Sequence, residues 1–132
     1  MATAFEAITT RQSWYASAAV AKYDAVEIGS DGKYQKANGS GLFAGICEYG
    51  AEAADRMITV VKGTFPCVCS GTVTAGAKLT VDTAKAGQMK VATENDAVYG
   101  VALNAAAAGE LPPKFLRGFE NIVLGNPLSF QP

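Results

Sequence analysis

Residues 98–110, VYGVALNAAAAGE, form an apolar run that ends in small residues and an acidic residue. An earlier copy, FAGICEYGAEAAD, occupies residues 43–55. Gly45 of the first copy and Gly100 of the second are 55 positions apart, and both stretches close on a carboxylate. The chain is therefore predicted to consist of two related halves.

The same spacing extends beyond these stretches. An offset of 55 also joins three further pairs: Gly32 with Gly87, Ala37 with Ala92, and Gly63 with Gly118. Upstream the offset falls to 53, where Val20, Val26 and Ile28 correspond to Val73, Leu79 and Val81. One half is thus predicted to carry a two-residue insertion in its first turn. Two copies are too few for a solenoid, which needs about three or more repeats. The pattern favours one pseudo-symmetric domain, with chance identity in a Gly- and Ala-rich chain as the alternative.

Length and charge narrow the function classes. A chain of 132 residues fits one domain that buries roughly two thirds of its unfolded surface. The formal net charge is -1, and the lysines and arginines are scattered along the sequence. A nucleic-acid binder or membrane-surface protein would be expected to carry a basic cluster. Neither a nucleic-acid partner nor a membrane partner is predicted.

The cysteines and the N-terminal segment indicate the compartment in which the chain folds. Three cysteines are present, and Cys67 and Cys69 are spaced so that they share one face of a strand without easily forming a disulfide. This pattern favours a reducing compartment. The N-terminus lacks a basic region followed by an apolar run, and no segment has the roughly 20 apolar residues of a membrane helix. We expect a soluble protein that does not use the usual secretory route.

Short β-rich runs separated by turns predict an all-β fold, a small barrel or sandwich. Gly63 is expected to break the β-branched run at residues 57–62, and Pro66 to place the next run at a sheet edge. The predicted strands are residues 24–28, 33–36, 42–49, 57–62 and 64–69 in the first half, residues 77–81, 88–92, 98–103 and 114–117 in the second, and residues 122–124 beyond the repeat.

The predicted organisation is an extended N-terminal arm at residues 1–18, a β domain at residues 19–118, and a C-terminal tail at residues 119–132. Within the domain, the repeats cover residues 19–63 and 72–118. Trp14 and Tyr15 form an aromatic pair in the arm, and aromatic residues are enriched among interface anchors. An alternative places Trp14 as a cap on the domain's own core. The arm is expected to be removable without unfolding the domain. Five residues are predicted to bind a partner: Arg11, Trp14, Tyr15, Phe119 and Phe130.

The residues offer little for catalysis. The chain contains no histidine, which removes the commonest general base and most transition-metal sites. The cysteines and hydroxyl residues have no recognisable partner base, and no second ligand pair accompanies Cys67 and Cys69. We predict that the protein is not an enzyme and has no cofactor and no metal site. An undetected enzyme remains a competing class, and it would require a cleft with converging polar groups.

Three segments and one glycine follow one another in a recognisable order: KGTFP at residues 62–66, GTVTAGA at residues 71–77, Gly87, and YGVALNAAAAGE at residues 99–110. Together they resemble the head-decoration, or capsid cement, proteins of tailed bacteriophages. The resemblance covers about residues 19–118. Two departures are the Pro112-Pro113 pair and the extension from Phe119 to Pro132, and both put the sheet edge and the partner-contact surface in doubt.

This resemblance implies a β-rich structural protein made in the host cytoplasm and carried on the outer capsid surface of the virion. Its implied partner is the major capsid protein, whose subunit contacts it reinforces, and its implied state is a homo-oligomer, with a trimer favoured. The alternative function is a non-catalytic β-barrel binding module of another assembly, such as a phage tail or a surface complex.

Overall fold

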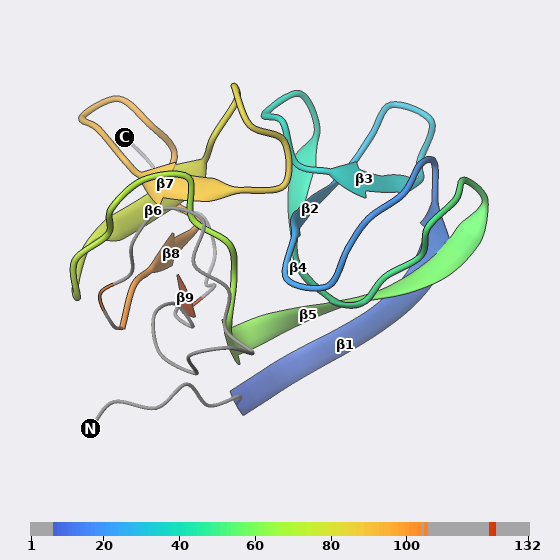
Figure 1. The fold of residues 1–132 in the computed structure, drawn as a ribbon, viewed down its shortest axis with the longest axis horizontal. Helices are drawn as coiled ribbons and strands as arrows, with labels where there is room; N and C mark the ends of the chain where they lie inside the picture. Colours follow the sequence, from blue (N-terminus) through green and yellow to red (C-terminus); the bar gives the residue numbers. More distant parts are fainter. Residues whose placement is uncertain (1–6, 104, 106–121, 124–132) are drawn as a thin grey trace.

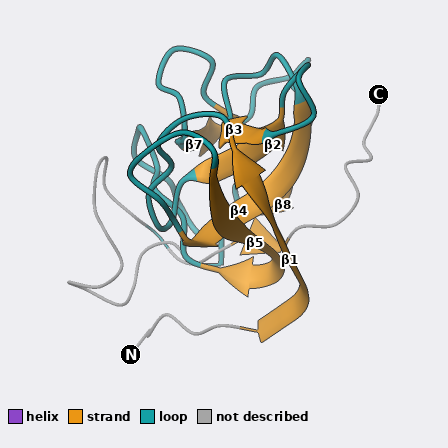
Figure 2. Ribbon diagram, turned by 90° about the vertical axis from the view of Figure 1, so that its right-hand side faces the viewer, coloured by secondary structure: helices purple, strands orange, loops and turns teal. Residues whose placement is uncertain are grey.

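The computed structural model describes residues 7–103, 105 and 122–123, and every regular element within them is a β-strand (Figure 2). The all-β prediction is confirmed. In chain order the strands are β1 (Ala7–Ala16), β2 (Ala25–Ile28), β3 (Tyr34–Lys36), β4 (Leu42–Tyr49), β5 (Arg56–Phe65), β6 (Lys78–Val81), β7 (Met89–Val91), β8 (Gly100–Val101) and β9 (Ile122–Val123).

Five of these strands close into a small barrel. Their hydrogen-bonded order is β1-β3-β2-β4-β5, and β1 pairs back with β5 to complete the ring. In Figure 1, β1 and β5 run side by side as a long ribbon pair. The seam between β1 and β3 is the shortest of the barrel, because a single parallel bridge, Ala16 to Tyr34, joins their described residues. Strand β9 pairs with the end of β5.

The second sheet repeats three strands of the barrel. Its order, β7-β6-β8, corresponds to β3-β2-β4. Val26 of β2 lies opposite Gly45 of β4, and Leu79 of β6 lies opposite Gly100 of β8. The β2–β3 and β6–β7 ladders keep the same correspondence. The offsets of 53 and 55 therefore describe one hydrogen-bonding pattern used twice, and the prediction of two related halves is confirmed for these strands.

The turns follow the same repeat. Tyr23 and Gly76 precede equivalent strands, and both have positive φ, 78° and 86°. The connection from β2 to β3 spans residues 29–33, whereas the connection from β6 to β7 spans residues 82–88. The two extra residues lie in the second half, where the change of offset predicts an insertion.

Two clusters of buried side chains hold the structure together. Phe65 is fully buried, and its ring centroid lies 5.8 Å from that of Tyr23. One cluster fills the barrel: Ala16, Val20, Val26, Tyr34, Cys47, Ile58 and Val60. The other lies between the barrel and the second sheet: Ala25, Ala37, Ile46, Val61, Phe65, Cys67, Cys69, Val73, Leu79, Val81, Met89 and Ala102. Because both sheets contribute to the second cluster, the two halves share one core.

Strand β1 belongs to the barrel, which corrects the expectation of a separate arm at residues 1–18. Ala7 lies opposite Thr64, Ala16 lies opposite Arg56, and the ladder between these ends is almost continuous. The backbone of β1 is extended, as expected, but its hydrogen bonds are made to β5. This pairing joins segments that are far apart in the chain, so it cannot be predicted from the pattern of residues 7–16 alone.

Strand β5 also differs from its prediction, because it passes through Gly63 without ending. Gly63 has a φ of 122°, and β1 shifts register opposite it, between Ile8 and Thr10. Glycine adopts positive φ at little steric cost, so it absorbs the irregularity inside the strand. The predicted strand at residues 114–117 lies outside the described residues, as does the 105–110 connection apart from Ala105.

Candidate partner-binding surfaces

Three of the five predicted partner-binding residues lie on β1, namely Arg11, Trp14 and Tyr15. The other two, Phe119 and Phe130, lie outside the described residues. Because β5 is paired with β1 along nearly its whole length, the three side chains project from a fixed strand. Their positions are set by the barrel.

Strand β1 presents its side chains on two faces, since successive residues of a strand point in opposite directions. Trp14 lies opposite Ile58, a member of the barrel cluster, so Trp14 belongs to the inner face. Arg11 and Tyr15 belong to the outer face by the same alternation. The rings of Trp14 and Tyr15 still meet edge to face, with centroids 5.5 Å apart. The predicted set is therefore divided between two surfaces.

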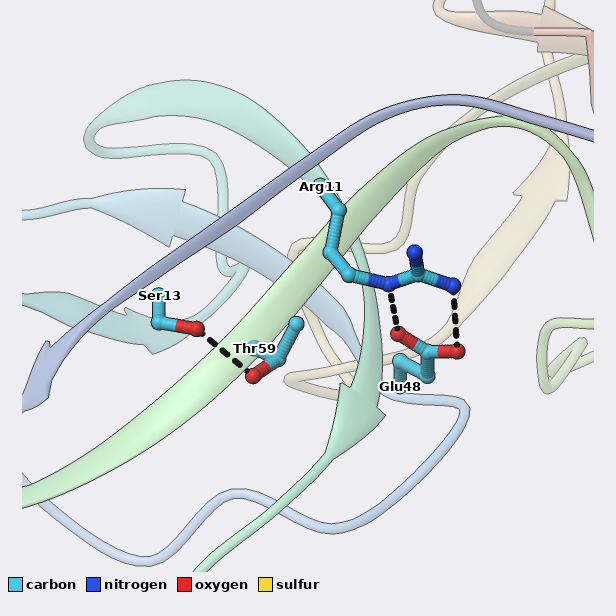
Figure 3. A network of polar contacts seen from close by, with 4 residues as sticks. All are labelled: Arg11, Ser13, Glu48 and Thr59. Atoms are coloured by element: carbon cyan, nitrogen blue, oxygen red, sulfur yellow. Dashed lines mark hydrogen bonds and ion pairs between the residues drawn. The ribbon is translucent and has the colours of Figure 1, made fainter.

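Arg11 is held in an ion pair within the chain (Figure 3). Its Nε donates to Oε1 of Glu48 at 2.7 Å, and its Nη2 donates to Oε2 at 3.1 Å. Such bidentate arginine–carboxylate pairs fix the relative orientation of the two side chains as well as pairing their charges. Glu48 lies on β4, and its side chain is nearly buried. Beside the pair, the hydroxyls of Ser13 and Thr59 are 2.8 Å apart. Arg11 thus joins β1 to β4 across β5 and neutralises Glu48.

Three large side chains are exposed on the outer side of these three strands, next to the hydroxyls of Ser13 and Thr59. Tyr49 lies opposite Thr59, which lies opposite Ser13, and the next row on the same side pairs Tyr15 with Met57. Tyr49 is 62% exposed, and Tyr15 and Met57 are also exposed. We call Tyr15, Tyr49 and Met57 the outer face. It is a surface of large apolar groups on rigid backbone.

A second apolar surface opens on the inner side, where the ladder between β1 and β3 stops. Leu42 lies opposite Ile28 at its rim and is 73% exposed. Trp14 is 49% exposed and belongs to neither buried cluster, so it does not cap the core. We call this surface the mouth groove. It is lined by Gln12, Trp14, Ile28, Gly32 and Tyr34.

Sequence reasoning missed the residues that complete these two surfaces: Ile28, Leu42, Tyr49 and Met57. The exposure of Met57 was predictable. Ile58 and Val60, two residues apart at the start of β5, point to the buried side of the strand, so Met57 points to the other side. Ile28 and Leu42 carried no comparable signal, because their exposure depends on where β1 and β3 stop pairing. Tyr49 was assigned to the predicted strand at residues 42–49, as the structure has it, but its exposure was not predicted.

The thiols are enclosed within the fold. Cys47, Cys67 and Cys69 are free and buried. Burial raises the pKa of the Cys47 thiol to about 12, and the negative charges of Asp24 and Glu48 act in the same direction. The thiolate is the nucleophilic form of cysteine, so Cys47 is protonated and unreactive at neutral pH.

Within residues 7–103, 105 and 122–123, no group of three or more His, Cys, Asp or Glu side chains is placed to hold a metal ion. In the same residues, no helix is long and apolar enough to cross a membrane.

This all-β domain exposes large apolar side chains on two surfaces, the outer face and the mouth groove. Such exposed apolar surfaces are typical of a protein-binding module. A sequence model of the phage cement protein family matches residues 6–115. The chain belongs to the phage cement protein family, a family of structural virion proteins, and the resemblance seen in the sequence is confirmed. No curated protein matches the chain.

Proposed function

We propose that this protein binds the outer surface of a phage capsid and stabilises contacts between major capsid subunits. The observation that carries the proposal is the pair of exposed apolar surfaces, the outer face on β1, β4 and β5 and the mouth groove between β1 and the β2–β3 hairpin. Exposed patches of this kind mark interaction sites. Membership of the cement family supports the capsid as the assembly in which that site is used.

The mechanism we propose is multivalent clamping. Each copy contributes modest contacts, and an oligomer, with a trimer as our favoured state, engages several capsid subunits at once. Linked contacts raise the overall affinity well above that of each single contact. Trp14 and Tyr15 supply apolar area, while Arg11 acts indirectly by fixing β1 against Glu48. Phe119 and Phe130 remain proposed contacts of the C-terminal segment.

Co-sedimentation with empty capsids tests this proposal. The wild-type protein should pellet with capsids in a saturable manner. Trp14→Ala and Tyr15→Ala should each weaken pelleting by about tenfold or more, because truncating an aromatic anchor typically costs upwards of 1.4 kcal/mol. Val91→Ala is the matched control, since Val91 is an exposed apolar residue of the second sheet.

The control should pellet like the wild type. Wild-type protein that fails to pellet above background would contradict the capsid role and would favour a binding module of another assembly, such as a tail.

A further inference from the structure

A hollow of about 410 Å³ opens beside the barrel and shares no lining residue with the mouth groove. Its lining comes from residues 19–22 between β1 and β2, from Lys36 at the end of β3, and from residues 50–52 after β4. The charged residues among them are Lys22, Lys36 and Glu52, and the others are alanine, valine and glycine. We call this hollow the lysine pocket.

The floor of the lysine pocket is fixed by the backbone. The N–H of Val20 donates to the carbonyl oxygen of Ala51 at 3.0 Å, and the N–H of Ala51 donates to that of Val20 at 2.9 Å. A Cβ on Gly50 would collide with the carbonyl oxygen of Val20, so the two segments approach this closely only because residue 50 is glycine. The hollow is therefore part of the folded structure and need not form when a ligand binds.

The two lysines of the pocket keep free donors. The ammonium group of Lys22 lies 5.1 Å from the ring centroid of Tyr23, and it forms no ion pair with a described residue. The ammonium group of Lys36 is 3.8 Å from Oδ2 of Asp24, which is too far for a hydrogen bond. Asp24 is not a lining residue, and its side chain is only 13% exposed. Both ammonium groups can therefore donate to a ligand in the pocket.

The internal repeat indicates that folding does not require these two charges. Lys36 of the β2–β3 ladder corresponds to Val91 of the β6–β7 ladder. Lys22 corresponds to Ala75 at the offset of 53. The second sheet builds the same hydrogen-bonding pattern with uncharged residues at both positions. The lysines of the first half are therefore available for a role outside the fold.

We propose that the lysine pocket binds one carboxylate side chain of a capsid subunit, with Lys22 and Lys36 as its charge partners. The inference deepens the proposed function and rests on it, because it adds a charged contact to the apolar ones. Gly50 directly follows Tyr49 of the outer face, so the pocket begins where that surface ends along β4. A partner that lies on the outer face can place an acidic side chain in the pocket.

The charge of the lining favours a carboxylate over a phosphate. Two lysines and one glutamate leave one net positive charge around the hollow, which a single carboxylate neutralises. A phosphate group carries close to two negative charges at neutral pH, and Glu52 would repel it more strongly. Charge complementarity of this kind gives specificity to an interface whose affinity comes from apolar contacts.

Titration of the full chain with glutamate blocked at both ends, which carries one carboxylate, tests the chemistry of the pocket by NMR. The backbone amide signals of Ala21 and Ala51 should shift saturably, with a dissociation constant in the millimolar range for one small contact. Blocked glutamine has nearly the same shape without the charge and should leave these signals in place. Lys22→Gln and Lys36→Gln should each abolish the shift, whereas Lys36→Arg should retain it. Thermal unfolding of each variant checks that it is folded.

Co-sedimentation with capsids tests the source of the carboxylate. At low salt, the double variant Lys22→Gln/Lys36→Gln should pellet about tenfold more weakly than the wild type, and Glu52→Gln should pellet about threefold more tightly. Lys78→Gln/Lys85→Gln is the matched control, since it removes the same charge from exposed residues of the second half and should pellet like the wild type. The difference between the wild type and the first double variant should vanish in about 1 M salt, where the Debye length falls to about 3 Å.

Blocked glutamate that moves no pocket signal, or moves it no more than blocked glutamine does, would overturn the inference. Inorganic phosphate that binds the pocket where blocked glutamate does not would overturn it as well, and so would a Lys22→Gln/Lys36→Gln variant that pellets like the wild type at low salt. Wild-type protein that binds blocked glutamate but does not pellet with capsids would contradict the proposed function and the shell as the source of the carboxylate, whereas the chemistry of the pocket would stand. The two failures are therefore distinguishable.

Discussion

Deletion of residues 1–18 is expected to abolish cooperative folding. The deletion removes β1, and with it the ladder that closes the barrel between Ala7 and Ala16. It also removes the buried side chain of Ala16 and the ion-pair partner of Glu48. An opened barrel would leave the edge of β5 unpaired and the barrel core accessible to water. The deletion is therefore expected to remove most of the free energy of unfolding, which is roughly 5–15 kcal/mol for a typical domain.

Circular dichroism and thermal melting measure this effect. The truncated chain should lose its cooperative transition, whereas deletion of residues 1–6 removes no residue of β1 and should preserve it. A truncated chain that melts cooperatively near the wild-type temperature would restore the idea of a separable arm. Because the large deletion disturbs the fold itself, single substitutions at Trp14 and Tyr15 are the cleaner probes of capsid binding.

Phe65→Ala is expected to lower the free energy of unfolding by about 3–5 kcal/mol, the usual cost of removing a buried phenylalanine. Phe65 is completely buried in the cluster that both sheets share, and it packs against Tyr23. The loss should therefore destabilise the barrel and the second sheet together.

Denaturant unfolding followed at several backbone amides provides the measurement. Amides of β2 and of β6 should report one common transition in the wild type and in Phe65→Ala, displaced to lower denaturant in the variant. Phe65→Leu, which leaves a smaller cavity, should cost less. Separate transitions for the two strands would show that the halves are independent units and that the core is not shared.

The repeat was predictable because matching residues recur in the sequence at constant offsets of 53 and 55 positions. Gly45 and Gly100 mark equivalent positions in two ladders, opposite Val26 and Leu79. Turn residues carried the rest of the signal, as at Gly32, whose φ of 79° suits a tight connection after β2. Both features can be read from the sequence without knowing which strands pair.

The place of β1 was not predictable in the same way. Its residues include Thr10, Gln12 and Ser13, all exposed, so no buried face imposes an alternating pattern. Its partner β5 lies beyond the whole β2–β4 region, and only tertiary pairing brings the two strands together. The aromatic pair at Trp14 and Tyr15 pointed to a binding surface, but the division of that pair between two faces follows from the ladder.

The candidate surfaces were predictable only in part for the same reason. Each is assembled from strands that are distant in sequence: the outer face joins Tyr15 to Tyr49 and Met57, and the groove joins Trp14 to Ile28. Composition indicated that interfaces rather than reactive groups would carry the function. The structure supplied the partners that complete each interface.

We propose that this chain acts as a clamp that strengthens the contacts between capsid subunits. The most direct measurement is the temperature at which capsids rupture, taken for bare capsids and for capsids saturated with the protein. The wild type should raise the rupture temperature, and Trp14→Asp at the same total concentration should raise it much less. Saturated capsids that rupture at the temperature of bare capsids would contradict the claim.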